Sequence, residues 1–292
     1  GIFIYDPRNP LHDIDDASTH EWSDNPTLHI YHYARSQYGG RLDPAIYDWD
    51  IEKVKESADW DDDFVGTKSG ELIKRYSCNG MYTLSDSPQR VMSDLMSSNR
   101  SRLIERGGKI WISSAKPKSP VATIHDGILV GGFEWDSSSP KRDTYNCAQT
   151  RFSANDREYE VVDGPLYRNS AWVSDDGETL TKSIELPFTD DHRIAQRIAK
   201  ASVAESRLGK RVSCRVLIEL LAIASDELVD SAVNISSNLW PMMNGKYIVS
   251  EMTISNATTI DLVLEEYDET IETDFVPETD EQDFTLEPLD IS

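Results

Sequence analysis

The stretch IELPFTDDHRIAQRIAKASVAESRLGKRVSC, residues 184–214, places a polar helix start and an amphipathic segment between two strand-like segments. Thr189 is expected to cap a helix over residues 190–208, because its hydroxyl can accept a backbone N–H and the two aspartates that follow suit the helix dipole. Gly209 would end this helix. The apolar stripe is expected to be Ile194, Ile198, Ala201 and Leu208. A helix between strands predicts an α+β fold in which it packs on, or crosses between, the strands.

Short strand-like segments flank this stretch from Pro120 onward, separated by Asp-Gly, Ser-Pro and Asn-Asp turn signals. They are VATI (121–124), ILVGGFEW (128–135), TYNCAQTRFS (144–153), REYEVVD (157–163), AWVS (171–174), TKSIELP (181–187), RVSCRVLIELLAIA (211–224), KYIVSEMTI (246–254) and TIDLVLEEY (259–267). This spacing predicts an antiparallel sheet or small barrel with the helix inserted in it.

Helical patterns dominate the N-terminal part. Asn25-Pro26 is a helix start, with Asn as the cap, and Gly39-Gly40 marks its end. A second helix is expected after Asp48, with Ile51, Val54 and Ala58 on one face. Residues 71–118 predict a β-α-β-β unit: a strand over LIKRYSCNGMY, a helix opened by Ser87-Pro88, and a hairpin with its turn at Gly107-Gly108.

These patterns predict several small units of α+β class. We expect a connector over residues 1–24, an α+β domain over 25–118, a β-rich barrel-like domain over 119–275, and an acidic linker or arm over 276–292. The last expectation rests on charge, since no basic residue follows Lys246 and residues 261–290 contain thirteen carboxylates.

The formal net charge of −23 is the strongest compositional signal. A surface that repels phosphates gains no affinity from counterion release, which argues against tight binding of DNA or RNA. Cys78, Cys147 and Cys214 lie far apart and form no CxxC pair, which argues against a disulfide scaffold or zinc site and fits assembly in a reducing cytoplasm. The chain begins with Gly1 rather than Met, as expected of a processed chain or an internal piece.

Few residues suggest chemistry. Asp61, Asp62 and Asp63 could bind a hard cation, but without EF-hand spacing a solvated turn is favoured. His29 and His32 lie about one helical turn apart, yet outside an HExxH pattern, which favours an ordinary packed or surface helix. Gly39-Gly40 and Gly131-Gly132 are interpreted as turn glycines rather than phosphate cradles. Four tryptophans could stack on sugar rings, although core packing is the commoner role: Trp49, Trp60, Trp135 and Trp240.

No constellation of catalytic residues stands out. The many Asp and Glu residues form no distinguishable pair of the kind that hydrolyses glycosides, and there is no GxSxG elbow, P-loop or GxGxxG. We therefore predict a non-enzymatic protein with no catalytic, cofactor-binding or metal-binding residues.

Several segments, in one order, resemble the tail-tip hub family of long-tailed bacteriophages, which includes the lambda tip attachment protein and the hub of gene transfer agents. They are IYDPRNP (4–10), WSDNPTLHIYHYARSQYGG (22–40), RYSCNGMYTLSDSPQRVMSDLMSS (75–98), RLIERGGKIWI (102–112), the opening stretch at 184–214, and KYIVSEMTISNATTIDLVLEEYDETIETDF (246–275). One departure is Ser225-Asp226-Glu227-Leu228-Val229, where such proteins usually have a Gly-Asp turn and a valine-rich strand.

The resemblance implies a homotrimeric ring in the virion, at the tail tip, that closes the tail tube. It also implies partners: the distal tail protein, the tape-measure protein, and fibres or receptor-binding parts through which a host receptor is reached. It implies α+β and barrel-like hub domains and no catalytic residue. A tail-associated peptidoglycan hydrolase and a receptor-binding tip protein remain alternatives. A carboxylate-coated channel would let phage DNA pass without specific binding, which would explain the charge.

Overall fold

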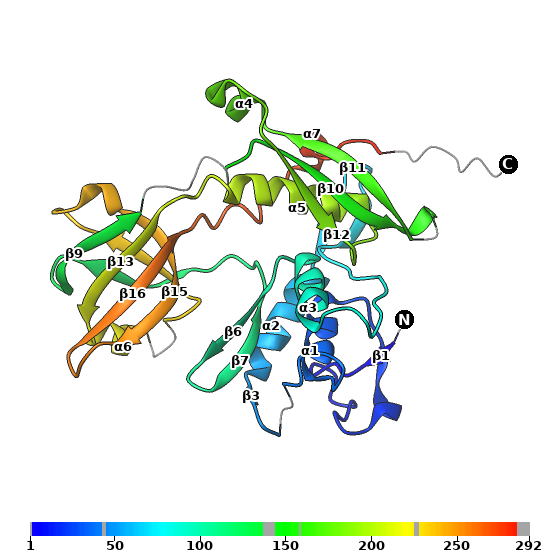
Figure 1. Ribbon diagram of the computed structural model, residues 1–292, viewed down its shortest axis with the longest axis horizontal. Coiled ribbons are helices and arrows are strands. Elements are labelled where there is room, and N and C mark those ends of the chain that lie inside the picture. Colours follow the sequence, from blue (N-terminus) through cyan, green and yellow to red (C-terminus); the bar gives the residue numbers. More distant parts are fainter. Residues whose placement is uncertain (1, 43–44, 137–143, 158, 225–227, 285–292) are drawn as a thin grey trace. The chain divides into compact units, whose positions relative to one another are not determined.

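The computed structural model describes residues 2–42, 45–136, 144–157, 159–224 and 228–284 (Figure 1). The chain has an α+β fold and divides into two compact units. Unit 1 comprises Gly1–Lys116, Asn146–Ala201 and Phe275–Ser292, and unit 2 comprises Pro117–Tyr145 and Ser202–Asp274. Residues 146–201, which the sequence groups with the β-rich domain, therefore lie in unit 1.

The first part of unit 1 packs three helices against a small sheet. The helices are α1 (Pro26–Arg35), α2 (Ile51–Asp62) and α3 (Pro88–Ser97), and the sheet, in the order β3-β7-β6, comprises β3 (Asp48–Trp49), β6 (Arg102–Arg106) and β7 (Lys109–Ser113). The predicted α1 start is confirmed, since the Asn25 side chain accepts the Leu28 N–H at 3.1 Å. The Gly107-Gly108 hairpin is also confirmed, with φ of 57° and 84° at the two glycines.

Two short ribbons complete this part. In one, β1 (Phe3–Ile4) pairs with β2 (Glu21–Trp22), which lies after the short helix η1 (Ala17–Thr19); in the other, β4 (Phe64–Gly66) pairs with β5 (Leu72–Lys74). The predicted strand over residues 72–82 thus ends at Lys74. Beyond it the backbone bonds to other segments, with the Cys78 N–H donating to the Asp24 carbonyl and the Asn79 N–H to the Phe188 carbonyl.

The rest of unit 1 is a three-stranded sheet with a helix packed on it (Figure 1). Its strands, in the order β11-β10-β12, are β10 (Cys147–Ala154), β11 (Glu160–Arg168) and β12 (Thr181–Leu186), with η2 (Asn155–Arg157) between β10 and β11. The helix is α5 (His192–Glu205), whose Ile194, Ala195 and Ile198 pack with Phe152 and Leu186.

The prediction of a strand over the AWVS segment is wrong. This segment lies in helix α4 (Ser170–Asp176), because the Asn169 side chain accepts the Trp172 N–H at 3.2 Å and Gly177 ends the helix at a φ of 73°. The local caps outweigh the apolar character of the segment.

Unit 2 is a curled six-stranded sheet, in the order β8-β14-β15-β16-β13-β9. Its strands are β8 (Pro120–His125), β9 (Leu129–Asp136), β13 (Arg211–Leu217), β14 (Ala232–Ser236), β15 (Gly245–Ile254) and β16 (Thr259–Glu266). The edges β8 and β9 are joined by four Cα steps, at most about 14 Å, whereas a flat sheet of six strands would separate them by about 24 Å. The sheet must therefore curl.

Two details of unit 2 differ from the sequence prediction. The sheets are mixed rather than antiparallel, since β8 runs parallel to β14, as β12 does to β10 in unit 1. The predicted strand over 211–224 ends at Leu217 and gives way to α6 (Glu219–Ile223), whose Leu220 is buried in the core. A short helix η3 (Pro241–Met243) precedes β15.

Residues 276–284 belong to unit 1, which differs from the solvated arm that their charge predicts. They include α7 (Pro277–Asp280), and the Lys200 ammonium contacts the Asp280 carboxylate at 2.8 Å. Gln282 and Gln196 exchange two hydrogen bonds, of 2.7 and 3.2 Å. These contacts therefore outweigh the repulsion among the carboxylates here. The remaining residues of the predicted arm, 285–292, lie outside the described residues.

None of the helices in the described part of the chain combines the length and the apolar character that crossing a membrane requires.

Candidate functional site

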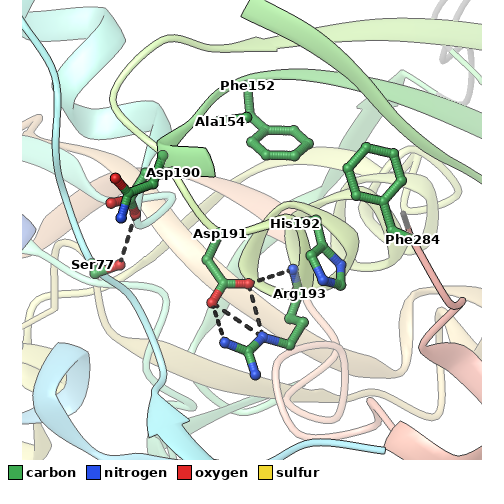
Figure 2. Close-up of a pocket in the computed structure, with 9 residues that line it drawn as sticks. Ser77, Phe152, Ala154, Asp190, Asp191, His192, Arg193 and Phe284 are labelled. Atoms are coloured by element: carbon green, nitrogen blue, oxygen red, sulfur yellow. Dashed lines mark hydrogen bonds and ion pairs between the residues drawn. The ribbon is translucent and has the colours of Figure 1, made fainter. Parts of the chain in front are cut away.

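A pocket of about 420 Å³ opens in unit 1, at the junction of β10, the start of α5 and the C-terminal segment (Figure 2). It is lined by Ser77, Phe152, Ala154, Asn155, Asp190, Asp191, His192, Arg193 and Phe284. Figure 2 shows Ser77 and Asp190 at one end and His192 and Phe284 at the other. A pocket of this size falls in the range of small-ligand sites.

The polar end is built by the turn between β12 and α5. The Ser153 N–H donates to the Thr189 carbonyl at 3.0 Å, which holds Thr189 beside β10. The helix cap is instead Asp191, whose carboxylate accepts the Arg193 N–H at 2.7 Å. The predicted cap at Thr189 and the helix bounds 190–208 are therefore wrong, because the Thr189 backbone is held beside β10 before the helix begins.

Asp191 and Arg193 neutralise each other. The Arg193 guanidinium donates to both carboxylate oxygens of Asp191, at 2.6 to 3.1 Å, and to Glu71 at 2.7 Å. Burial alone would raise the pKa of Asp191, but the side-chain and backbone hydrogen bonds from Arg193 lower it below its ordinary value. These two pocket residues form a fixed, charge-balanced clamp.

Asp190 has a different environment. Its carboxylate accepts from the Asn79 amide at 3.2 Å and, at a long 3.5 Å, from the Ser77 hydroxyl. Burial raises its pKa despite the opposing hydrogen bond from Asn79. Among the described residues no cationic side chain reaches Asp190 within 4.0 Å, so its charge is unmatched there.

Aromatic side chains form the other end. The Phe284 ring lies 5.9 Å from Phe152 and 5.3 Å from His192, centre to centre. His192 Nδ1 hydrogen-bonds with the Gln196 amide at 3.1 Å. The C-terminal segment thus supplies one wall of the pocket.

The pocket brings a serine, a histidine and an aspartate together but does not arrange them as a nucleophile and base. Ser77 is bonded to Asp190 rather than to His192, and His192 is bonded to Gln196. A serine nucleophile needs its base within hydrogen-bond reach. The geometry therefore suits binding better than acyl transfer.

The aspartates at the end of α2 are structural. Asp61 is fully buried, and its carboxylate accepts from Thr27 and from the Asn99 amide, at 2.6 to 3.1 Å. Asp62 pairs with Arg8 and Lys74. The prediction of a solvated turn is wrong for Asp61 and Asp62, because α1 and the chain after α3 close over the end of α2, whereas Asp63 is exposed.

The histidine pair is packed. His29 Nε2 hydrogen-bonds with the Ser23 carbonyl at 2.8 Å, and burial lowers the pKa of both His29 and His32. Across the described ranges, no group of three or more His, Cys, Asp or Glu residues is arranged to hold a metal ion.

The four tryptophans divide between core and surface. Trp49 is buried, and Trp60 stacks under the Arg75 guanidinium at 3.7 Å. Trp135 is 44% exposed and meets Trp240 edge to face at 6.2 Å. Gly39 and Gly40 lie against the backbone at the end of α1, and Gly132 lies in β9 against the Trp240 ring, so these three glycines serve close packing. Gly131 instead adopts a φ of 93°.

Sequence reasoning identified Asp190 and Asp191 only as first-turn residues and did not find the pocket. One end combines Ser77 and Asp190, which are more than a hundred positions apart, and Phe284 from the C-terminal segment lies at the other end. The signal available in the sequence was the run Asp190 to Arg193, which three residues separate from the end of β12.

Comparisons with known proteins find similarity in structure only. No protein-family model matches the sequence, and no curated protein matches it. A protein in the virion of a native gene transfer agent particle aligns over 91% of this chain with a TM-score of 0.57 and 12% identity. A tail protein from Neisseria meningitidis MC58 aligns over 88% of it with a TM-score of 0.50 and 11% identity.

These alignments cover 54% of the gene transfer agent protein and 69% of the Neisseria protein. The chain therefore spans about half the length of the first. At such low identity the likeness concerns the fold, which this chain shares with proteins of a virion and of a tail.

Proposed function

We propose that this chain is a structural subunit of a phage tail-tip hub. In this role it closes the tail tube, joins the distal tail protein to fibres or receptor-binding parts, and assembles as a homotrimer. The observation that carries the proposal is the alignment of 91% of the chain with a gene transfer agent virion protein. The ordered sequence segments that resemble the hub family support it independently.

The position of the chain in an intact particle is the decisive test. A short epitope would be inserted in the exposed β6–β7 turn, beside Gly107, because no side chain is needed at that turn. Antibody labelling and electron microscopy would then locate the epitope. We expect label only at the tail end distal to the capsid, with threefold symmetry in averaged images. Label along the tube or on the capsid would refute the hub role.

The acidic balance supports a second part of the proposal, that the hub lines the DNA exit route. A wall rich in carboxylates repels phosphates and reduces adhesion of DNA as it slides. In the assembled ring the lumen is then expected to be more acidic than the outer face. A neutral or basic lumen would contradict this part while leaving the hub role intact.

A non-enzymatic role is also part of the proposal. The pocket lacks a Ser–His contact, and its Asp191 is clamped by Arg193. Purified protein is expected to leave host cell wall intact in a gel-based clearing assay. Clearing that disappears on Asp190→Asn would favour the peptidoglycan hydrolase instead. Direct adsorption of the purified chain to host cells would favour a receptor-binding tip protein.

A further inference from the structure

The pocket in unit 1 has a half-buried negative charge at one end and aromatic rings at the other. Asp190 supplies the charge, and its hydrogen-bond partners, Asn79 and Ser77, are neutral. The wall is the ring pair Phe152 and Phe284, 5.9 Å apart. Asp190 is half-buried, so water screens its charge only in part, and a cation that reached it would gain energy from the ion pair.

We propose that this pocket binds a lysine or arginine side chain of a partner protein, with Asp190 as its counter-ion and the Phe152 and Phe284 rings against its aliphatic stem. Long basic side chains bury their methylene groups on apolar surface and place the charge at the far end. The order of groups in the pocket matches this shape (Figure 2).

The other charged side chains of the pocket do not prevent a cation from binding beside Asp190. Arg193 would repel a cation, but its charge is balanced by Asp191 and Glu71, at 2.6 and 2.7 Å. The lining therefore carries an excess of negative charge centred on Asp190. A bare metal ion suits the site less well, because no group of three metal-ligating side chains is found among the described residues.

Charge complementarity favours a basic partner. The chain carries a formal net charge of −23, so a partner surface that approaches it gains from basic side chains. A pocket that binds one basic side chain would fix where the partner sits, which the general attraction between opposite charges does not do. Binding of a basic side chain in this pocket does not depend on the hub role, so either proposal can be refuted without the other.

Short peptides provide the test. The full chain would be titrated with acetyl-Gly-Arg-Gly-amide and acetyl-Gly-Lys-Gly-amide, and with the norleucine analogue as the uncharged match, by ligand-observed NMR. We expect saturable binding of the two basic peptides and at least about tenfold weaker binding of the norleucine peptide, the loss of one well-placed ion pair. Equal binding of all three, or no saturable binding, would overturn the proposal.

Variants then locate the site. Asp190→Asn is expected to weaken binding of the basic peptides about tenfold, whereas Asp15→Asn, an equal charge change at an exposed position, should leave it unchanged. Phe284→Ala should also weaken binding, since it removes one wall of the pocket without changing the charge. This variant tests the site even if Asp190→Asn does not fold. Equal effects of Asp190→Asn and Asp15→Asn would show non-specific attraction and refute the pocket.

Discussion

The Asp61 carboxylate at the end of α2 accepts both the hydroxyl and the backbone N–H of Thr27 at the start of α1, at 2.6 and 3.1 Å. The same oxygen accepts the Asn99 amide at 2.9 Å, whereas the other carboxylate oxygen is buried without a hydrogen-bond partner. One side chain thus joins two helices and the chain after a third, and half of its hydrogen-bonding capacity is unused.

Asp61 is expected to make stability fall as pH rises. Burial raises the pKa of Asp61 from 3.8 to about 7, against the opposing hydrogen bonds from Thr27 and Asn99. Between these values the folded chain holds a proton that the unfolded chain has lost, so the free energy of unfolding decreases from about pH 4 to about pH 7 and is level above. The contribution is about 4 kcal/mol.

Asp61→Asn tests this, because an amide is neutral at every pH and keeps an acceptor for Thr27. The free energy of unfolding in urea would be measured at pH 5 and pH 8. We expect the variant to gain stability relative to the wild type between these two values. Asp59→Asn, on the same helix but exposed, is the control and should shift both values by less than about 1 kcal/mol. An unchanged difference at the two pH values would contradict the prediction.

Gly39 is required by close packing against the end of α1. A Cβ atom there would lie 2.1 Å from the Tyr33 carbonyl oxygen. Gly39→Ala is therefore expected to lower the free energy of unfolding by more than about 2 kcal/mol. Gly66→Ala is the matched control, since its Cβ meets nothing within 4 Å, and its effect should stay within about 1 kcal/mol. Chemical denaturation measures both, and similar losses would refute the packing argument.

The features that sequence reasoning located are those fixed by neighbouring residues. The Asn25 cap and the Gly107-Gly108 hairpin are set within a few positions, so their patterns are visible in the chain. The apolar Ala-Trp-Val run predicts a strand, but the caps at Asn169 and Gly177 on either side of it form helix α4.

Features that depend on distant residues could not be predicted. The parallel pairing of β10 with β12 and the burial of Asp61 both require knowing which segments meet. The pocket is the extreme case, since Asp190, Ser77 and Phe284 come from three separate stretches. Of the departure at residues 225–229, residues 225–227 lie outside the described residues.

The C-terminal segment is held partly by the ion pair between Lys200 and Asp280, whose side chains are only 14% and 19% exposed. A double-mutant cycle of Lys200→Gln and Asp280→Asn is expected to give a coupling of about 1 kcal/mol, reduced in high salt. The cycle of Lys55→Gln and Glu52→Gln, an exposed pair 2.8 Å apart, should give less than half of this. Equal coupling in the two cycles would mean that burial adds nothing to the contact.

The two units have separate cores, so a change in one is expected to leave the other folded. Cys214 lies in the core of unit 2, and Cys147 is buried in unit 1. Trp240 packs on the unit 2 core beside Phe133 and contacts Gly132. Trp240→Ala should therefore destabilise unit 2 by about 2–4 kcal/mol, the usual cost of truncating a large packed side chain.

Thiol labelling reads each unit separately. A buried thiol reacts only when its surroundings open, and burial also raises the pKa of Cys214 to about 12, which suppresses the reactive thiolate. In Trp240→Ala, labelling of Cys214 by iodoacetamide is expected to accelerate at least thirtyfold, while that of Cys147 stays at the wild-type rate. Mass spectrometry of the two peptides gives both rates from one sample. If both cysteines accelerate together, the chain opens as one cooperative body, and the division into two independent cores does not hold.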